Sequence, residues 1–539
     1  MNEFDFIVVG AGSAGCVLAN RLTACGRHTV LLLEAGGDDR SFWLRTPIGY
    51  GMSFYNPKVN WMYRTEPDPA LAGRQGYWPR GKVLGGSSSI NAMVFIRGQP
   101  RDFDDWAALG NPGWGWADVL PYFKKMEDSA HGPSAWRGRG GPLHVSDVSA
   151  DVHRLCETYL RAGEQIGLAR NHDINGASNE GVAINQITTR DGLRESASTA
   201  YLRPALRRSN LSLQTGAHVT RLLFDGARAS GVAYLQAGQE KRCTARREII
   251  VAGGAINTPQ ILQLSGVGPA ARLQSLGIAV VADSPAVGQH LQDHLCIDYV
   301  YRSRVPTLNA ELGSWRGKLW AGLRYLAMRR GPLALSINQA GGFARSRPEL
   351  AHPNLQLYFS PLSYTRALPG QRALTATDAF AGLSICAQPC RPTSRGFLEL
   401  RGTDPMQAPR IVSNALATGY DRDEMLEAAL FVRKIAQAPA MRAVIDHEIA
   451  PGPLVQSHAQ VMDDVAQRAS TVFHPVSTCR MGPDPRQAVV DHQLRVHGLR
   501  GLRVVDASVF PTLTSGNTNA PTIMLAERAA DLLLQSHTP

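Results

Sequence analysis

Hydrophobic positions near the N-terminus repeat with two different periods. Residues 6–9 and 30–33 are continuous apolar runs, and residues 17–22 between them place apolar side chains at helical spacing. A short apolar run beside glycine indicates a buried strand, and a spacing near 3.6 residues indicates a helix. The pattern therefore predicts a strand, a helix and a second strand in succession.

The spacing of apolar residues also differs between segments further along the chain. Residues 211–252 alternate between apolar and polar positions and predict a β-ribbon. Residues 151–175 predict a helix from the spacing of Leu155, Leu160, Ile166 and Leu168. Thr258-Pro259 is expected to begin another helix that runs to Leu264, because proline is favoured in the first helical turn.

Loops and proline-bounded apolar runs such as 353–359 are frequent between residues 301 and 464. This texture predicts a second, largely sheet-built domain that covers the first. One segment within it, residues 318–330, is basic and amphipathic, with an apolar face made by Leu319, Leu323 and Leu326. We expect this face to pack on the protein itself, with contact to a membrane surface as the alternative.

The C-terminal part of the chain returns to strand and helix patterning. Residues 502–505 predict a strand that ends at Asp506, and residues 521–534 predict an amphipathic helix. A chain of 539 residues is too long for one hydrophobic core, so two or more domains are expected. We expect the C-terminal end to rejoin the first domain and to place the chemistry at the domain junction, where pockets concentrate.

Composition excludes some classes of protein. The formal net charge of +11 permits contact with nucleic acid or anionic membranes, but the basic residues are scattered and no nucleic-acid motif is present. We therefore expect no nucleic-acid partner. The N-terminus lacks the features of a signal peptide, and no apolar stretch is long enough to span a membrane. These features predict a cytoplasmic protein, with peripheral membrane contact as the alternative.

Cysteine and histidine pairs do not predict a metal site. The eight cysteines are spread thinly, which indicates reduced thiols, and Cys386 and Cys390 lack a second pair to complete a site. His290 and His294 are four residues apart but lack the glutamate of a zinc-binding helix. We expect no metal.

The loop after the first strand has the pattern Gly10-x-Gly12-x-x-Gly15. Between a strand and a helix, these glycines allow a tight turn, close approach of the backbone to a pyrophosphate and close packing of helix on strand. The helix N-terminus offers free N–H groups to the anion. Glu34 follows the second strand, where its carboxylate can accept hydrogen bonds from ribose hydroxyls. An ordinary glycine turn is the alternative.

A second stretch, residues 81–92, is rich in glycine and serine. Its small side chains allow another molecule or chain segment to lie against its backbone. A bound cofactor is expected there, because the apolar residues on both sides argue against a flexible linker. Gly266 and Gly268 resemble another dinucleotide fingerprint. They follow a predicted helix instead of a strand, so we do not expect a nicotinamide site there.

Five blocks of the sequence together resemble the glucose-methanol-choline (GMC) oxidoreductases, and most closely their bacterial alcohol, choline and sorbose dehydrogenase branch. The resemblance extends over nearly the whole chain, and the five blocks occur in the family's order. They are residues 10–36, 81–98, 254–269 and 287–294, and the C-terminal motifs that contain His474, Cys479 and Asn517.

The resemblance implies an α/β fold (α+β overall), with a Rossmann-like FAD-binding domain and a second, mainly antiparallel-sheet substrate domain. The first domain would comprise residues 1–155, 190–300 and 465–539, and the second residues 156–189 and 301–464. FAD is expected to bind without a covalent bond, because Ile90 stands where choline oxidase has a histidine that attaches to FAD. The residues expected to contact FAD are Gly10, Gly12, Ser13, Ala14, Gly15, Glu34, Ala35, Val83, Gly86, Ser87, Asn91, Ala92, Val94, Val219, Asp506 and Ala507.

The family resemblance also implies that His474 and Asn517 are the catalytic pair. Alcohol oxidation requires removal of the hydroxyl proton and transfer of a hydride to flavin N5, and a neutral imidazole suits the proton step. His474 is therefore the expected base, and Asn517 is expected to hydrogen-bond the substrate oxygen. Phe473 is expected to line the substrate pocket, with a role as a plain core aromatic as the alternative.

The leading hypothesis is an FAD-dependent alcohol dehydrogenase that passes electrons to a quinone or another carrier. An oxidase that uses O₂ and releases hydrogen peroxide is the nearest alternative. A nucleic-acid or membrane-surface binding protein and a GMC-fold lyase or photodecarboxylase are less favoured. Aliphatic, aromatic and sugar alcohols all remain open as substrates.

Overall fold

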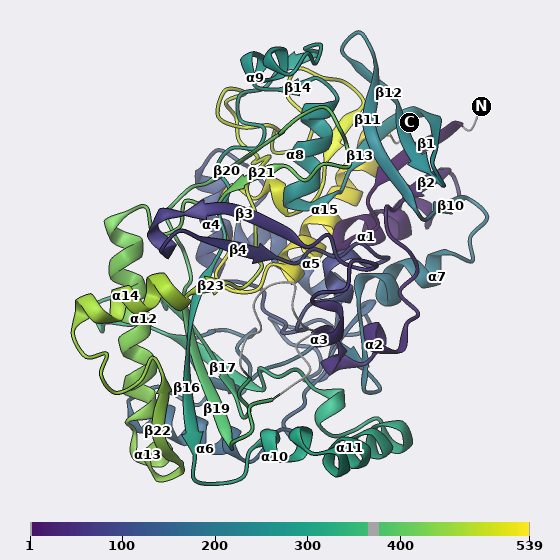
Figure 1. Cartoon of the computed structure of the whole chain (residues 1–539). Helices are drawn as coiled ribbons and strands as arrows, with labels where there is room; N and C mark the ends of the chain where they lie inside the picture. Colours follow the sequence, from purple (N-terminus) through teal and green to yellow (C-terminus); the bar gives the residue numbers. More distant parts are fainter. Residues whose placement is uncertain (1–2, 365–376, 538–539) are drawn as a thin grey trace.

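The computed structural model describes residues 3–364 and 377–537 and contains two large sheets (Figure 1). The first sheet has four adjacent parallel strands that begin at one edge, and a short fifth strand pairs in parallel with the fourth. Two antiparallel strands extend the sheet to its other edge. In spatial order the strands are β10 (Leu211–Gln214), β2 (Val30–Leu33), β1 (Glu3–Val9), β13 (Gln239–Val251), β12 (Arg228–Gln236) and β11 (Ala217–Asp225), with β24 (Leu502–Val504) beside β13.

The carboxyl ends of the parallel strands lie at one level. Val9 pairs with both Leu33 and Val251, and Val251 pairs with Val504. The loops that follow these strands therefore meet at one edge of the sheet, which is where open parallel sheets bind ligands. This edge brings the segment after β24 beside the first glycine loop, as the sequence predicted.

Helix α1 (Ser13–Thr23) packs against the C-terminal helix α15 (Asn519–Ser536). Arg21 forms two hydrogen bonds with the buried Glu527 carboxylate, from Nε at 2.8 Å and from Nη2 at 2.6 Å. Ser13 Oγ donates to Asn519 Oδ1 at 2.8 Å. The two ends of the chain are thus joined beside the glycine loop, and the predicted C-terminal helix is confirmed.

The second sheet is antiparallel throughout and also has seven strands. Its core is shared with helices α6 (Leu155–Gln165), α12 (Gly419–Ala436), α13 (Pro439–Val444) and α14 (His458–Arg468). In spatial order its strands are β22 (Ile445–Ala450), β16 (Leu295–Ser303), β19 (Gly382–Pro389), β18 (Leu355–Ser360), β17 (Ala340–Ala344) and β7 (Gly181–Ile184), with β23 (Ser470–Thr471) beside β16.

Side chains alternate across the middle strands of this sheet, as the period of two in a strand requires. One set packs into the core shared with the helices: Ile297, Tyr299, Leu357, Phe359, Leu383 and Ile385. The other set lines a large cavity: Cys296, Asp298, Val300, Tyr358, Ser360, Ser384 and Cys386. The second sheet therefore forms one wall of that cavity.

These two sheets confirm the predicted fold class, a Rossmann-like sheet with a second antiparallel domain. The exact domain boundaries remain a prediction. Strands β16 and β23 belong to the second sheet although they begin at Leu295 and Ser470, inside ranges predicted for the first domain.

Several predicted elements differ in their bounds. Helix α6 ends at Gln165, ten residues before the predicted end at 175, because Gly167 has a φ of +93° that a continuing helix does not allow. In the predicted ribbon, β11, β12 and β13 are antiparallel as expected. β10 is not part of the ribbon, because it pairs in parallel with β2.

Helix α8 (Gly254–Leu264) begins four residues before the predicted start at Thr258. Pro259 consequently lies inside the helix and cannot donate a hydrogen bond to the carbonyl of Ala255. Thr478 Oγ1 donates to that carbonyl instead, at 2.6 Å. A side chain from the C-terminal part of the chain thus donates the hydrogen bond that the Ala255 carbonyl cannot receive from Pro259.

The prediction that the apolar face of residues 318–330 packs on the protein is wrong. The segment forms helix α11 (Trp315–Met328), in which Leu319, Leu323 and Leu326 are all at least 51% exposed. The helix projects from the second domain (Figure 1).

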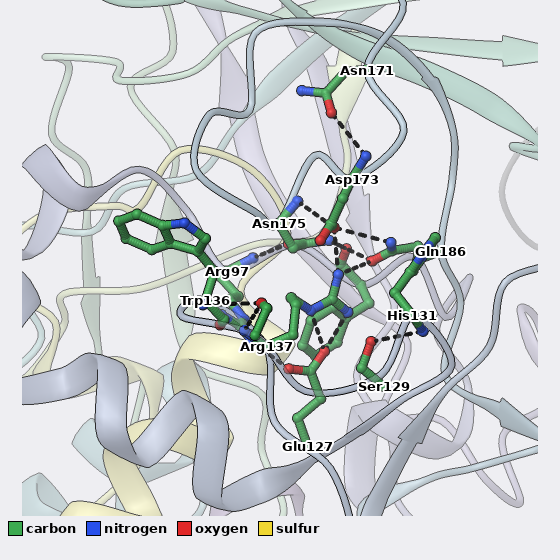
Figure 2. A network of polar contacts seen from close by, with 12 residues as sticks. Arg97, Glu127, Ser129, His131, Trp136, Arg137, Asn171, Asp173, Asn175 and Gln186 are labelled. Carbon is green, nitrogen blue, oxygen red and sulfur yellow. Dashed lines mark hydrogen bonds and ion pairs between the residues drawn. The ribbon is translucent and has the colours of Figure 1, made fainter.

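A buried ionic network connects the region after the glycine-serine loop to the second sheet (Figure 2). Arg97 and Arg137 both donate to the fully buried Glu127, and Arg137 Nε lies 2.9 Å from Glu127 Oε1. Arg137 also contacts Asp173, and it donates to Gln186 Oε1 at 2.9 Å. Because Gln186 follows β7 closely, the network fixes one domain against the other.

All eight cysteines are free thiols, and only Cys25 among them is exposed. Within residues 3–364 and 377–537, no helix combines the length and the apolar composition that crossing a bilayer requires. The remaining elements are α2 (Phe42–Arg45), α3 (Tyr50–Ser53), β3 (Tyr63–Asp68), β4 (Arg74–Trp78), α4 (Pro100–Ala108), α5 (Trp116–Met126), β5 (Glu127–Ser129), β6 (Leu143–Val145), β8 (Thr189–Arg190), β9 (Leu193–Arg194), α7 (Arg203–Ala205), β14 (Val267–Gly268), α9 (Ala270–Ser275), β15 (Ala282–Asp283), α10 (Leu308–Gly313), β20 (Phe397–Glu399) and β21 (Arg410–Val412).

Candidate active site

A cavity of about 970 Å³ extends from the carboxyl edge of the first sheet to the inner face of the second. Most of the predicted cofactor residues line it, together with Phe473, His474 and Asn517. Those cofactor residues are Gly10, Gly12, Ser13, Ala14, Glu34, Ala35, Gly86, Ser87, Asn91, Ala92, Val94, Val219, Asp506 and Ala507. A junction of two domains is a frequent place for such a pocket.

The three fingerprint glycines have different surroundings. A Cβ on Gly10 would lie 2.5 Å from the carbonyl oxygen of Ala252, and one on Gly15 would lie 1.8 Å from that of Gly10. A Cβ on Gly12 would have no atom nearer than Gly86 Cα at 4.0 Å. Gly10 and Gly15 therefore allow tight backbone packing, whereas Gly12 leaves the backbone open to the cavity.

The start of α1 faces the same cavity through Gly12, Ser13 and Ala14, and no side chain caps this helix end. Uncapped N–H groups at a helix N-terminus bind anions such as a pyrophosphate. Gly86 approaches this turn so closely that a Cβ there would lie 2.7 Å from Gly12 Cα. The glycine-serine loop thus lies opposite the first glycine turn, and its predicted contact with a cofactor remains a prediction.

Two predicted cofactor residues, Gly15 and Val83, are not among the residues that line the cavity. Gly15 lies where α1 packs on the first turn, and the Val83 side chain is fully buried. Both residues shape the site through packing, and their predicted contact with the cofactor remains a prediction.

The carboxylates at the sheet edge already have protein partners. Glu34 accepts hydrogen bonds from the backbone N–H groups of Ala11 at 2.9 Å and Gly36 at 2.8 Å, and burial raises its pKa to about 7. Asp506 accepts from Gly254 N–H at 2.8 Å and from Thr258 Oγ1 at 2.6 Å, at the start of α8. Because each carboxylate oxygen has two lone pairs, both groups retain acceptor capacity towards the cavity.

His474 and Asn517 lie together at the far end of the cavity. Asn517 Nδ2 is 3.1 Å from His474 Nε2. The Asn517 amide has a defined orientation, because Gln356 Nε2 donates to its Oδ1 at 3.2 Å and Gln388 Nε2 donates to Gln356 Oε1 at 3.0 Å. Asn517 therefore presents its N–H groups to His474.

A second histidine contacts the other side of the His474 ring. His294 Nδ1 lies 3.0 Å from His474 Nδ1, and His294 Nε2 lies 2.8 Å from the carbonyl oxygen of Cys390. A carbonyl only accepts, so His294 carries its proton on Nε2 and accepts on Nδ1. His474 must then donate from Nδ1, so its Nε2 is unprotonated and accepts from Asn517 Nδ2.

Burial lowers the pKa of His474 well below its usual value, and the charges of His294 and Arg80 lower it further. Burial also lowers the pKa of His294, to about 4. Both rings are therefore neutral near pH 7, and His474 is in the form that accepts a proton.

The backbone around His474 is fixed by a set of short contacts. Asp293 Oδ1 accepts from His474 N–H at 2.7 Å, and Arg80 Nη2 donates to the Phe473 carbonyl at 2.6 Å. Phe473 itself has a φ of +71°, a conformation that a bulky residue adopts only when its surroundings impose it. These contacts hold the histidine in position.

Phe473 contributes to an aromatic group in the cavity wall. Its ring lies 5.5 Å from that of Phe54, which contacts Tyr55 at 4.8 Å and Tyr77 at 5.2 Å. All four side chains line the cavity, and Phe473 directly precedes His474 in the chain. The cavity therefore offers an apolar, aromatic surface next to the base.

The sequence did not assign roles to Arg80, Asp293, Gln356 or Gln388, and it considered His294 only as a possible metal ligand. In the described part of the chain, no group of three or more histidine, cysteine or acidic side chains is placed to bind a metal. The only local signal for Asp293 and His294 was their place in the matched block 287–294.

The observed site fits a dinucleotide flavin. The open backbone at Gly12, the uncapped start of α1 and the close glycine-serine loop suit a pyrophosphate, and the cavity continues from there to His474. Residues from both sheets would surround the bound group.

Comparison with known proteins agrees with this geometry. Two family models described as GMC oxidoreductase match residues 4–296 and 392–526. The chain is 42% identical to "Alcohol dehydrogenase [acceptor]" of Pseudomonas putida, over 99% of this chain and 96% of that protein. It is 41% identical to "Oxygen-dependent choline dehydrogenase" of Vibrio vulnificus, over 99% of this chain and 94% of that protein.

Solved structures show the same fold. Pyridoxine 4-oxidase from Mesorbium loti superposes with a TM-score of 0.89 at 31% identity, covering 99% of this chain and 100% of that one. A formate oxidase variant from Aspergillus oryzae, described for its FAD modification, superposes with a TM-score of 0.90 at 27% identity, covering 99% of both chains. From its family models, its relatives and its fold, the chain belongs to the GMC oxidoreductases, FAD-dependent enzymes, and it acts on alcohol-type substrates.

Proposed function

We propose that the protein oxidises an alcohol to an aldehyde or ketone with His474 as the base, and that it transfers the electrons to a quinone or another acceptor than O₂. The observation that carries this proposal is the state of His474. Its ring is neutral, its Nδ1 proton is directed to His294, and its Nε2 lone pair lies 3.1 Å from Asn517 Nδ2 within the cavity.

The chemistry follows from these two side chains. His474 Nε2 removes the hydroxyl proton of the substrate, and Asn517 Nδ2 donates a hydrogen bond to the same oxygen as negative charge develops on it. The FAD that the two glycine-rich loops would hold would supply the two-electron acceptor that this oxidation requires. The aromatic wall around Phe473 keeps water away from the reacting oxygen.

Among possible substrates, the cavity favours alcohols with an apolar or aromatic body. Phe54, Tyr55, Tyr77 and Phe473 offer ring surfaces next to the base. Choline is a second candidate, because relatives at 41–42% identity are named choline dehydrogenases and aromatic faces also attract quaternary ammonium groups. Sugar alcohols, which need many polar partners, fit this wall less well.

FAD is proposed to bind without a covalent bond. Residues 86–92 contain no histidine or cysteine, and Ile90 lines the cavity there. The group would be held by the α1 N-terminus, Glu34 and the glycine-serine loop. Acid precipitation should therefore release the flavin into the supernatant, and flavin that stays with the pellet would contradict this assignment.

The function is tested by mixing the holoenzyme anaerobically with a panel of aromatic, aliphatic and sugar alcohols and with choline. Bleaching of the flavin absorbance identifies the substrates, and failure of every alcohol to bleach it would refute the proposal. Reoxidation of the reduced enzyme by O₂ is then compared with reoxidation by a soluble quinone. Faster reaction with O₂ would favour the oxidase alternative.

A further inference from the structure

Helix α11 is a well-formed helix that exposes its apolar face. The Ser314 hydroxyl accepts from Gly317 N–H at 3.0 Å at its start, and Arg329 N–H closes its end on the Tyr325 carbonyl at 2.9 Å. Only Ala321 and Tyr325 are buried within it. Tyr325 OH donates to the carbonyl of Gly192 at 3.1 Å, so a narrow seam attaches the helix to the protein.

Exposed apolar side chains recur along the whole length of α11, and together with those of α2 we call them the α11 patch. Four of them, Trp315, Leu319, Leu323 and Leu326, are spaced by three or four residues and therefore share one face of the helix. Helix α2 adjoins α11, because the Phe42 ring lies 6.3 Å from the ring of the buried Tyr325 and 5.1 Å from that of Trp43. The patch comprises Trp315, Leu319, Trp320, Leu323, Leu326 and Met328 of α11, exposed by 51–71%, and Phe42 and Trp43 of α2, exposed by 44–47%.

Such a surface is unusual for a protein surrounded only by water. Large exposed apolar patches mark sites that contact another molecule or a membrane. Two tryptophans among aliphatic side chains are typical of helices that lie in the interface of a bilayer, where an indole has one apolar face and one polar N–H.

The basic residues beside the patch favour an anionic lipid surface over a second copy of this chain as the binding partner. Helix α11 contains no acidic residue, and the exposed cations Arg316, Lys318, Arg324 and Arg329 lie in or directly after it. A fifth cation, Arg330, is paired with Asp151 at 3.0 Å. Cations beside an apolar helix face complement anionic lipid headgroups. A symmetric contact with a second copy would instead bring these like charges together.

We propose that the α11 patch docks on a bilayer surface that contains anionic lipid, with α11 lying along the interface. The apolar face enters the boundary of headgroups and acyl chains, and the basic residues contact the headgroups. The attachment is peripheral and depends on ionic strength. The proposal does not depend on the identity of the alcohol or of the electron acceptor.

The segments next to the patch also line the cavity. Tyr50 follows the end of α2 by five residues, and Ile337 and Asn338 follow the end of α11 by nine and ten residues. Docking would therefore place this wall of the cavity close to the lipid. If the proposed transfer to a quinone also holds, a lipid-soluble quinone would be concentrated at that wall.

The test is flotation of the full-length holoenzyme with vesicles of phosphatidylcholine alone or of phosphatidylcholine with phosphatidylglycerol. The wild type should float with the anionic vesicles, and high salt should reduce its binding. Trp320→Ser combined with Leu323→Ser should weaken that binding by about tenfold or more. The matched control is Met406→Ser combined with Leu454→Ser, which removes two apolar residues exposed by 56% and 86% outside the patch.

The control variant should float like the wild type, and both variants should bleach with alcohol as fast as the wild type in detergent-free solution. Wild-type protein that does not float, or a patch variant that floats as well as the control, would overturn the proposal. A patch variant that changes only the oligomeric state in analytical ultracentrifugation would also overturn it and would assign the patch to self-association. Loss of alcohol oxidation in every variant and the wild type would refute the proposed function and leave the flotation result valid.

Discussion

His294 Nδ1 lies 3.0 Å from His474 Nδ1, with the two imidazole rings perpendicular. Only one proton occupies that contact, and the Cys390 carbonyl requires that it come from His474. His294 therefore sets the tautomer of the base, in the way that a partner of one ring nitrogen generally determines the state of the other.

Removing the base tests the central assignment. We expect His474→Ala to slow anaerobic flavin reduction by alcohol about 10²–10⁴-fold, because the variant lacks the imidazole Nε2 that is proposed to take the hydroxyl proton. Stopped-flow absorbance measures the rate, and the flavin content of the variant is the control. Bleaching at the parental rate would show that another group removes the proton.

His294 is a positioning residue, and its replacement should change a pH profile. His294→Ala removes the acceptor for His474 Nδ1–H and, at acid pH, the positive charge of protonated His294 that lowers the pKa of His474. That pKa should rise, so the acid limb of kcat/KM should move to higher pH, and kcat should fall about tenfold or more.

His294→Gln is the matched variant, since its amide can donate to the Cys390 carbonyl and accept from His474. We expect it to recover most of the rate. A purely structural role for His294 would leave the acid limb of both variants at the wild-type pH.

Asn517 should act on the chemical step more than on binding. We expect Asn517→Ala to lower kcat about 10²–10³-fold with a smaller change in KM, because the hydrogen bond strengthens as the substrate oxygen gains charge. Gln356→Leu removes the donor that orients the Asn517 amide and should give a weaker effect of the same kind. A change in KM alone would assign Asn517 to substrate binding.

Substitutions of Gly12 and Gly15, two glycines of the same motif, should have different effects. Gly12→Val places its side chain in the cavity, where the nearest protein atom to a Cβ is 4.0 Å away. We expect a folded protein that binds FAD at least about tenfold more weakly, measured by flavin titration. Gly15→Ala puts a Cβ 1.8 Å from the Gly10 carbonyl oxygen, so it should lower the yield of folded protein. Normal flavin affinity in Gly12→Val would exclude the pyrophosphate from this turn.

The buried network around Glu127 should contribute to stability more than any surface pair. Glu127→Gln leaves the buried Arg97 and Arg137 without their carboxylate and should cost about 3–5 kcal/mol, seen as a lower midpoint in urea unfolding. The control Glu164→Gln removes an exposed partner of Arg170 and should cost about 1 kcal/mol or less. Equal midpoints for the two variants would contradict this ranking.

Local patterns predicted the local parts of the structure well. The strand, glycine turn and helix around Gly10 were recognisable because each depends on neighbouring residues only. His474 and Asn517 were found through the family resemblance, which supplied a pairing that their separation in sequence hides. His294 and Gln356 were not assigned, because their contacts join strands and loops more than 150 residues apart in the chain.

The amphipathic helix α11 shows a different limit. The spacing of Leu319, Leu323 and Leu326 correctly predicted an apolar helix face, but spacing carries no information about what covers that face. The early start of α8 has a similar origin, since Asp506 and Thr478 stabilise its first turn from the other end of the chain.

The alternation along β16, β18 and β19 has an evolutionary consequence. Every second residue faces the cavity, and the residues between them pack against the helices on the other face of the sheet. Substitutions at Asp298, Tyr358 or Ser384 can therefore alter the fit for a new alcohol while the packing that keeps the domain folded is left in place. One half of each strand is free to diversify, and the other half is constrained.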